Sequence, residues 1–439
     1  MTIKLDVQDA ETGEVSRDTL IKRYSAVRLE TEELCRPLVT EDYVMQTSPD
    51  VSPPNWHLGH TTWFFERLLL EPYLPGYSPH HPLFNYIFNS YYESLGPRND
   101  RDRRGFLSRP TVQEVYDFRS AIDRAMGDLI ETVDEPHWPE IAAMIELGLN
   151  HEQQHQELLL MDVKHIFASN PLRPVYREAG DRKRAQGTLP PPMEFAEIPG
   201  GVTQIGHGGR GFAYDNEGPK HRVFLNDFRL MTRLVTNGEF LVFIQEGGYD
   251  DPRWWLSDGW ATVRERGWRS PLYWAEADGT WMVMTLRGYE PLVLDEPVSH
   301  VSYYEADAFA RWAGRRLPTE GEWEHAVCSR GITPRTGNLL EDRAWGPRPA
   351  NADQITPNEL QQLFGDVWEW TQSAYLAYPG YRQAAGPLGE YNGKFMSNQM
   401  VLRGGSFGTP RSHIRATYRN FFQCDKRWPF AGFRLAQDE

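Results

Sequence analysis

Apolar side chains recur every three or four positions in the first part of the chain, a spacing that predicts amphipathic helices. After a polar leader at residues 1–15, a first helix is expected over residues 16–38. Its apolar face would carry Leu20, Tyr24, Val27, Thr31 and Leu34. A second helix should carry His60, Phe64, Arg67 and Leu68.

Two further helices follow from a capping motif and from a longer periodic run. Thr111 and Glu114 form a T-x-x-E capping box directly after Pro110, which predicts a helix start. The apolar face behind it would be Val115, Phe118, Ile122, Met126, Leu129 and Val133. A fourth helix is expected over residues 139–168, with Ile141, Met144, Gly148, His151, His155, Leu158 and Asp162 on its inner face. Four such helices predict a bundle over residues 1–168.

The pattern changes after residue 168. Residues 169–193 are rich in proline and charge, which is typical of a linker. Residues 194–439 are rich in glycine and tryptophan and contain short β-like runs such as 222–225 and 401–403. Only residues 301–313 and 320–328 have a clear helical pattern. The second half is therefore expected to be an irregular α+β domain, which makes the chain a multidomain α and α+β protein.

Composition excludes several classes of function. The 439 residues carry a formal net charge of −15, whereas a nucleic-acid binder normally presents a basic surface to phosphate. No apolar run is long enough to span a membrane, and the N-terminus lacks the apolar core of a signal peptide. The three cysteines are far apart and odd in number, as in a reducing compartment. A cytoplasmic globular protein is expected, without nucleic-acid or membrane partners.

The segment HEQQHQELLL places His151 and His155 one helical turn apart. Both imidazoles then lie on the face predicted to be the core, where each ring nitrogen needs a partner. A metal ion can be that partner, although two satisfied core histidines would have the same pattern. A third ligand could come from His57 or His60 in WHLGH, and spacing alone does not choose between them. Three imidazoles accept iron, zinc, cobalt or nickel.

A second cluster places four arginines within residues 98–104 of an acidic chain. Such a cluster is often a solvated loop with internal ion pairs, but arginine also binds carboxylates in a bidentate fork. Tyr91 and Tyr92 precede it, and a tyrosine near a metal could donate a proton.

These motifs together resemble the EgtB-type ergothioneine sulfoxide synthases over nearly the whole chain. WHLGHTTWFFE and HEQQHQELLL are similar to the DinB-like four-helix domain of that family. The second part is similar to the formylglycine-generating-enzyme fold, a C-type-lectin-like α+β domain, through GRRLPTEGEWEHA, GDVWEW, RGGSF and GFRLA. The resemblance implies a DinB-like bundle at 1–168, a linker at 169–193 and a formylglycine-generating-enzyme-like domain at 194–439.

The resemblance also implies roles for individual residues. The iron(II) ligands of the family match His60, His151 and His155, which leaves His57 as a neighbour of the site. Gln154 and Asn420 match the residues that hold trimethylhistidine in this family. Phe421 comes directly after Asn420, at a position where many relatives have tryptophan. Arg101 and Arg104 match the pair that holds the carboxylate of the sulfur donor. The catalytic residue is expected to be Tyr91 or Tyr92, as in the cysteine-using branch, since residues 375–381 offer no clear equivalent of the second-domain tyrosine.

One departure bears on the sulfur donor. Relatives that use γ-glutamylcysteine have an acid and a base where this chain has Phe422 and Lys426, which favours free cysteine. The expected reaction is an iron(II)-dependent coupling of cysteine to the imidazole C2 of Nα-trimethylhistidine with O₂. A true formylglycine-generating enzyme is disfavoured, because only Cys424 lies in the C-terminal core region.

Three other functions remain open at this stage. A histidine-using relative of ovothiol type would share the fold and the metal ligands. A zinc-dependent thiol transferase could activate a thiolate on the same three histidines. A binding module without catalytic activity is the third possibility, because lectin-like folds often only bind.

Overall fold

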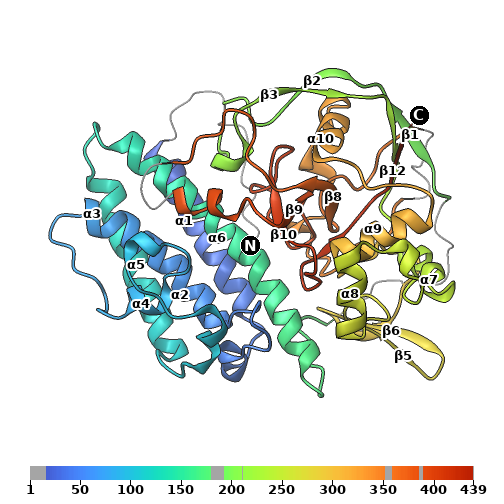
Figure 1. Ribbon diagram of the computed structural model, residues 1–439. Helices are drawn as coiled ribbons and strands as arrows, with labels where there is room; N and C mark the ends of the chain where they lie inside the picture. The colour runs from blue at the N-terminus through green and yellow to red at the C-terminus, as the bar shows by residue number, and fades with distance from the viewer. Residues whose placement is uncertain (1–15, 179–191, 210, 352–357, 385–388, 439) are drawn as a thin grey trace. The chain divides into compact units, whose positions relative to one another are not determined.

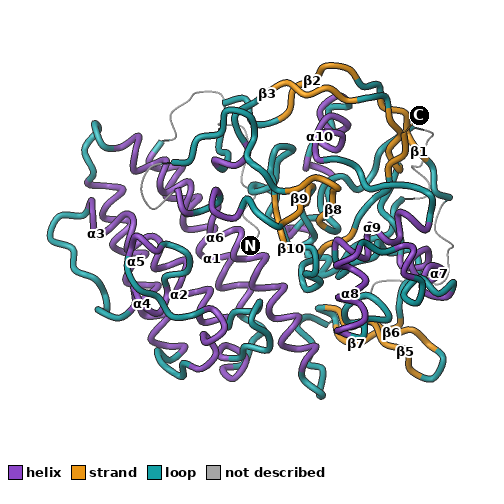
Figure 2. The backbone as a smooth tube through the Cα atoms, viewed as in Figure 1, coloured by secondary structure: helices purple, strands orange, loops and turns teal. Residues whose placement is uncertain are grey.

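The computed structural model describes residues 16–178, 192–209, 211–351, 358–384 and 389–438. The predicted leader at 1–15 and most of the predicted linker lie outside these residues. The chain forms two compact units. The first comprises residues 1–159 together with two later segments, 207–214 and 384–391. The remainder of the chain forms the second unit, and the strands of the described residues, orange in Figure 2, all belong to it.

The first unit is built on four long helices (Figure 1), as the periodicity predicts. They are α1 (Arg17–Cys35), α2 (Pro54–Phe65), α5 (Val112–Thr132) and α6 (Trp138–Ser169), the last of which continues into the second unit. Shorter elements connect them: η2 (Thr40–Val44), η3 (Glu66–Leu70), α3 (Glu71–Tyr73), α4 (Phe84–Phe88), η4 (Glu93–Leu95) and η5 (Arg101–Phe106). The capping box of α5 forms as predicted, with Thr111 accepting from the backbone N–H of Glu114.

Helix α2 is buried on every side, which is the position of a central helix. Two glycines allow its neighbours to approach closely. A Cβ at Gly59 would overlap the ring of Phe88, and a Cβ at Gly148 of α6 would lie 2.6 Å from the ring of Phe65. The helix predicted to carry His60, Phe64, Arg67 and Leu68 is present, although from Glu66 it widens into the π-helical turn η3.

The predicted helix faces are correct for most positions, but the charged residues behind them were not foreseen. Arg28, Arg119 and Glu152 are 3%, 0% and 0% exposed, whereas Met144 and Leu158 are only half-buried. Glu152 on α6 accepts hydrogen bonds from Arg28 of α1 at 2.9 Å and from Arg119 of α5 at 2.5 Å. A buried carboxylate needs such partners, so this ion network links three helices directly beside His151.

The second unit is the predicted irregular α+β domain, and its described residues form four small sheets. A four-stranded sheet has the order β10 (Asn420–Gln423), β9 (Gln399–Arg403), β8 (Trp368–Ala374) and β11 (Ala431–Gly432). A three-stranded sheet has the order β1 (Phe195–Ile198), β4 (Phe228–Met231) and β12 (Ala436–Asp438). The others pair β2 (Gly201–Ile205) with β3 (His221–Leu225), and β5 (Trp274–Ala277), β6 (Thr280–Thr285) and β7 (Gly288–Pro291). The predicted strands at 222–225 and 401–403 are confirmed.

Helices α9 (Tyr303–Trp312) and α10 (Glu320–Ser329) confirm the two helices predicted in this half. Two further helices, α7 (Asn237–Gln245) and α8 (Ser257–Arg266), lie in segments that have no clear helical pattern in the sequence. The sequence of α7, NGEFLVFIQ, is apolar on nearly all sides, so it has little helical period to detect. Its capping box between Thr236 and Glu239 was the available signal.

Candidate metal centre and substrate residues

Three histidines of the first unit bring their ring nitrogens together. His60 comes from α2, and His151 and His155 lie one turn apart on α6. One donor nitrogen of each lies within 4.8 Å of the others, and all three residues are buried. This is the set of residues that the resemblance implies for the metal. No other group of three metal-ligating side chains is found in the part of the chain that the structure describes.

The spacing of these nitrogens fits a transition-metal ion. Nε2 of His60 and Nε2 of His151 are 3.2 Å apart. Two nitrogens bound to one ion at about 2.0–2.1 Å would be separated by about 2.8–3.0 Å at octahedral angles and by about 3.3–3.4 Å at tetrahedral angles. The chemistry of the donors agrees, because imidazole suits iron, zinc, copper and nickel.

The protonation of the three rings also suits coordination. Burial lowers the pKa of His151 to about 3 and lowers the pKa values of His60 and His155 well below their usual range. Neutral imidazole offers one nitrogen lone pair. In His60 that lone pair is on Nε2, because Nδ1 donates to the carbonyl oxygen of Phe88 at 2.6 Å.

His57 contacts the cluster without belonging to it. Its Nδ1 lies 2.9 Å from Nδ1 of His155, and the residue is 3% exposed. His57 is absent from the group of gathered donor atoms, whereas His60 is part of it. Sequence spacing did not decide whether His57 or His60 is the third ligand, and the gathered donor atoms favour His60.

Aromatic rings stack against His60 on both sides. Trp56 lies parallel to it, with ring centroids 4.5 Å apart, and Trp63 stacks on it at 5.5 Å. The guanidinium of Arg104 lies 3.3 Å from the centre of the Trp56 ring. These rings restrict the orientation of His60 and keep water from its face, since buried aromatic side chains offer no space for solvent.

The two arginines implied in carboxylate binding differ in their surroundings. Arg104 is buried, and its guanidinium donates to the hydroxyls of Ser52 at 2.8 Å and Ser90 at 3.0 Å. Arg101 is half-buried and donates to the Tyr91 hydroxyl at 3.0 Å and to the carbonyl of Asp50. Arg104 also lowers the pKa of His60 through its charge, so it lies within electrostatic range of the metal ligands.

The two tyrosines suggested by the sequence are placed differently. Tyr92 is 2% exposed, and its ring lies 5.6 Å from Trp63. Its hydroxyl has no hydrogen-bond partner among the described residues, and burial raises its pKa far above the usual value. Tyr91 instead uses its hydroxyl to accept from Arg101.

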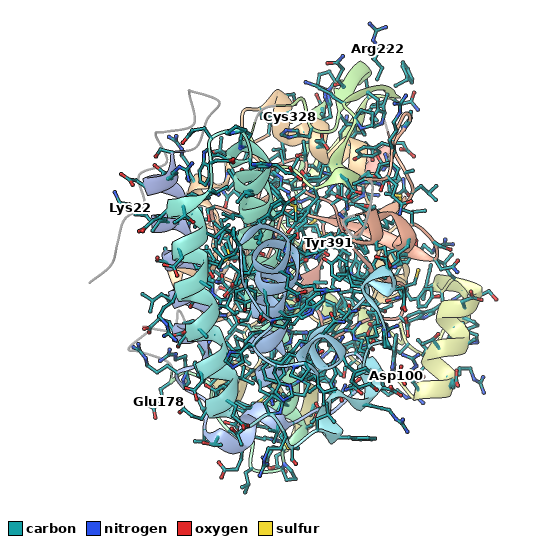
Figure 3. All side chains as sticks on the ribbon, turned by 90° about the vertical axis from the view of Figure 1, so that its left-hand side faces the viewer. Lys22, Asp100, Glu178, Arg222, Cys328 and Tyr391 are labelled. Atoms are coloured by element: carbon teal, nitrogen blue, oxygen red, sulfur yellow. The ribbon has the colours of Figure 1, made fainter. Side chains whose placement is uncertain are left out.

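A third tyrosine, which sequence reasoning missed, lies closer to the metal ligands. Tyr391, labelled in Figure 3, belongs to the first unit although it is far along the chain. Its hydroxyl donates to Oε1 of Gln154 at 2.5 Å, and its ring meets that of His151 edge-on with centroids 5.6 Å apart. Tyr391 lies ten positions beyond residues 375–381, where no clear equivalent of a second-domain tyrosine was found. No local motif marks Tyr391.

The segment that carries Tyr391 is fixed to the helical unit by its neighbour. The carboxylate of Glu390 accepts from the backbone N–H groups of Glu93 at 2.9 Å and Ser94 at 3.0 Å. Tyr214, from the other late segment of this unit, stacks on Tyr391 with ring centroids 5.4 Å apart.

The remaining substrate residues suggested by the sequence belong to the second unit. Asn420 begins β10, and its Oδ1 accepts from the backbone N–H of Phe421 at 2.9 Å. Phe421 stacks on Tyr375 with ring centroids 4.0 Å apart, and Phe422 meets Trp428 edge-on at 5.2 Å. The two phenylalanines are therefore packed within their own unit.

Comparison with known proteins gives matches over both halves of the chain. The DinB superfamily matches residues 23–159, and the family described as sulfatase-modifying factor enzyme 1-like domain matches residues 182–439. Within the described residues, no helix is long and apolar enough to cross a membrane.

Several curated proteins are similar to this chain. "Hercynine oxygenase" from Mycolicibacterium thermoresistibile is 32% identical, over 90% of this chain and 89% of that protein. The protein of the same name from Mycolicibacterium smegmatis is 31% identical, over 97% of this chain and 100% of that protein. "Ergothioneine biosynthesis protein 1" from Schizosaccharomyces pombe is 30% identical, over 52% of this chain and 28% of that protein.

Proposed function

Because the chain belongs to the hercynine oxygenase family of ergothioneine biosynthesis, we propose that it couples cysteine oxidatively to the imidazole C2 of Nα-trimethylhistidine. The proposed metal is iron(II), held by His60, His151 and His155. The observation that carries this proposal is the gathering of three neutral imidazole nitrogens within 4.8 Å.

The proposed reaction is balanced with O₂ as the only oxidant. One thiol S–H and one imidazole C–H are broken, and a C–S bond and an S=O bond form. The four electrons removed reduce O₂, so that one oxygen atom enters the sulfoxide and the other leaves as water. Iron(II), when bound, would supply the redox chemistry that lets O₂ react with a thiol.

Residues of this chain would bind and orient the substrates. Arg104 and Arg101 would receive the cysteine carboxylate, because a guanidinium binds a carboxylate through two parallel hydrogen bonds. Gln154 and Asn420 would hold trimethylhistidine. The stacked rings of Trp56 and Trp63 would keep solvent from the reacting sulfur.

We assign the proton donor to Tyr391 in preference to Tyr91 or Tyr92. The ring of Tyr391 contacts His151 itself, whereas Tyr92 contacts Trp63 and Tyr91 contacts Arg101. Substitution of each tyrosine by phenylalanine tests this assignment. Tyr391→Phe should shift products from sulfoxide toward oxidised thiol, and Tyr91→Phe and Tyr92→Phe should not. A shift confined to Tyr91→Phe or to Tyr92→Phe would return the role to that one of the two residues suggested by the sequence.

The function itself is tested by loading the protein with iron(II) under anaerobic conditions. Trimethylhistidine, cysteine and O₂ are then added, the products are identified by mass spectrometry and O₂ consumption is recorded. Sulfoxide should appear only when both substrates and iron are present. His60→Ala and His151→Ala should abolish iron binding and turnover, whereas His137→Ala, an exposed histidine, should change neither. Thiol transfer by the zinc-loaded protein without O₂ consumption would support the transferase instead.

A further inference from the structure

A hydrogen bond between two imidazoles links His57 to one of the proposed metal ligands. Nδ1 of His57 and Nδ1 of His155 are 2.9 Å apart, and both residues are buried. At that distance one nitrogen must donate and the other must accept. A neutral imidazole has a proton on only one nitrogen, so the contact fixes the tautomers of both rings.

Metal binding determines the direction of this bond. Nδ1 of His155 is engaged with His57, which leaves Nε2 of His155 to coordinate the ion. A neutral imidazole that coordinates through Nε2 carries its proton on Nδ1. His155 is therefore the donor, and His57 accepts on Nδ1 with its own proton on Nε2.

We infer that His57 is a positioning residue for the metal centre, which orients His155 and strengthens it as a ligand by accepting its Nδ1 proton. This inference rests on the metal site of the proposed function. Partners of this kind hold a ligand ring in place and raise its basicity, and their removal typically weakens metal binding by about 10- to 100-fold.

The three ligands differ in what holds them. A backbone carbonyl, that of Phe88, accepts from His60, so no side-chain substitution removes that partner. Nδ1 of His151 is buried and has no hydrogen-bond partner among the described residues. The Nδ1 of His155 instead contacts a side chain that is not a proposed ligand, so His57 is the position at which ligand orientation can be altered without removing a ligand.

Three substitutions distinguish orientation from simple packing. In His57→Asn the side-chain oxygen can occupy the place of Nδ1 and accept from His155. In His57→Gln the amide reaches the place of Nε2 instead, so polarity remains but the bond to His155 is lost. His57→Leu removes every acceptor. Thermal melting of the metal-free variants shows whether each one folds. If His57→Leu does not fold, the comparison of His57→Asn with His57→Gln still tests the inference.

The test measures cobalt(II) and iron(II) affinity by chelator competition, together with the visible spectrum of bound cobalt(II). His57→Gln and His57→Leu should bind about 10- to 100-fold more weakly than the unsubstituted protein, with a changed cobalt spectrum. His57→Asn should restore affinity to within about threefold and recover the spectrum. These readouts need no turnover, so they remain informative if the proposed substrates are wrong.

Several results would overturn the inference. Equal affinities for the Asn, Gln and Leu variants would reduce His57 to a packing residue. Complete loss of metal in His57→Leu with retention in His60→Ala would make His57 itself a ligand. An unsubstituted protein that binds neither ion would remove the metal site and this inference together.

Discussion

The two arginines proposed to bind the carboxylate of the sulfur donor differ in how firmly their guanidinium groups are held. Arg104 is held in one orientation by Trp56, Ser52 and Ser90, so its guanidinium is preorganised. Arg101 bonds a tyrosine hydroxyl and a backbone carbonyl, neither of which carries charge. Preorganised guanidinium groups lose little entropy on binding a carboxylate, so most of the binding free energy is expected from Arg104.

Replacement of Arg104 by lysine keeps the charge but loses the planar fork. Arg104→Lys should raise the KM for cysteine by about ten- to hundredfold, since a hydrogen bond to a charged group contributes about 1.5–3 kcal/mol. The KM for trimethylhistidine should change little. Arg103→Ala is the matched control, because Arg103 is an exposed neighbour in the same cluster. Steady-state kinetics with each substrate varied in turn measures the effect. An unchanged KM for cysteine would remove Arg104 from the donor site.

At the scale of elements, the segment carrying Tyr391 depends on one carboxylate. Glu390 accepts two backbone N–H groups at η4, and Tyr391 is the next residue. If Glu390 acts by positioning Tyr391, substitution of Glu390 should change the product ratio only in a protein that still contains Tyr391.

Glu390→Gln replaces one accepting oxygen by a donor, which faces a backbone N–H. Hydrogen exchange at the amides of Glu93 and Ser94 should become roughly fivefold faster, as expected for the loss of about 1 kcal/mol. The product ratio should shift toward oxidised thiol, as in Tyr391→Phe, and the double variant should show no additional shift. Glu93→Gln is the control, because the Glu93 side chain is exposed. An additive double variant would show that Glu390 acts independently of Tyr391.

A second element-scale feature is the buried Asp366, just before β8. Its carboxylate accepts from Asn338 at 2.7 Å and from the backbone N–H of Arg348 at 2.8 Å. Burial nevertheless raises its pKa to about 6. Because this folded-state value lies above the unfolded one, protonation of Asp366 favours folding below about pH 4. That contribution is lost as the pH rises through about 6.

Asp366→Asn removes the ionisation and should stabilise the protein at pH 7.5 by about 1–3 kcal/mol, since one pKa unit corresponds to about 1.4 kcal/mol. The difference in unfolding free energy between Asp366→Asn and the unsubstituted protein should shrink as the pH falls below about 6 and vanish near about pH 4. Thermal unfolding of both proteins across this range measures it. Asp278→Asn is the control, because Asp278 has the same left-handed backbone but is exposed. A stability difference that does not vary with pH would contradict the assignment.

At the scale of the whole molecule, the residues that we propose for the substrates are divided between the two compact units. Gln154 belongs to the helical unit, and Asn420, Phe422 and Lys426 belong to the other. The choice of sulfur donor is expected to depend on the second unit. Phe422, packed on Trp428, offers no acceptor for the ammonium of a γ-glutamyl group. Leaving such a charge without a partner is costly.

Cysteine should therefore exceed γ-glutamylcysteine in kcat/KM. The double variant Phe422→Asp with Lys426→Arg should narrow the difference, because it supplies an acceptor for the ammonium and a fork for the carboxylate. Competition between the two thiols for a limited amount of trimethylhistidine, followed by mass spectrometry, measures the preference. A product mixture dominated by the γ-glutamyl sulfoxide would contradict the proposed donor and leave the metal ligands unaffected.

The sequence by itself determined those features that depend on neighbours along the chain. Helical periodicity and the Thr111–Glu114 capping box predicted α5, and the one-turn spacing placed His151 and His155 on one face of α6. These features were predictable because backbone hydrogen bonds and side-chain period act over three to four residues. The prediction of the core faces was less accurate, because Arg28, Arg119 and Glu152 are buried in an ion network that the spacing of apolar residues does not reveal.

The way in which distant segments combine at the candidate metal centre followed from the tertiary fold alone. His57 and His60 are equally plausible by spacing, and the packing of α2 against α6 directs His60 to His151 and His57 to the far nitrogen of His155. Tyr391 reaches Gln154 from 237 residues further along the chain. Such contacts depend on the folding of the whole chain, because no local propensity specifies which surfaces of two helices, or which late segment, will meet.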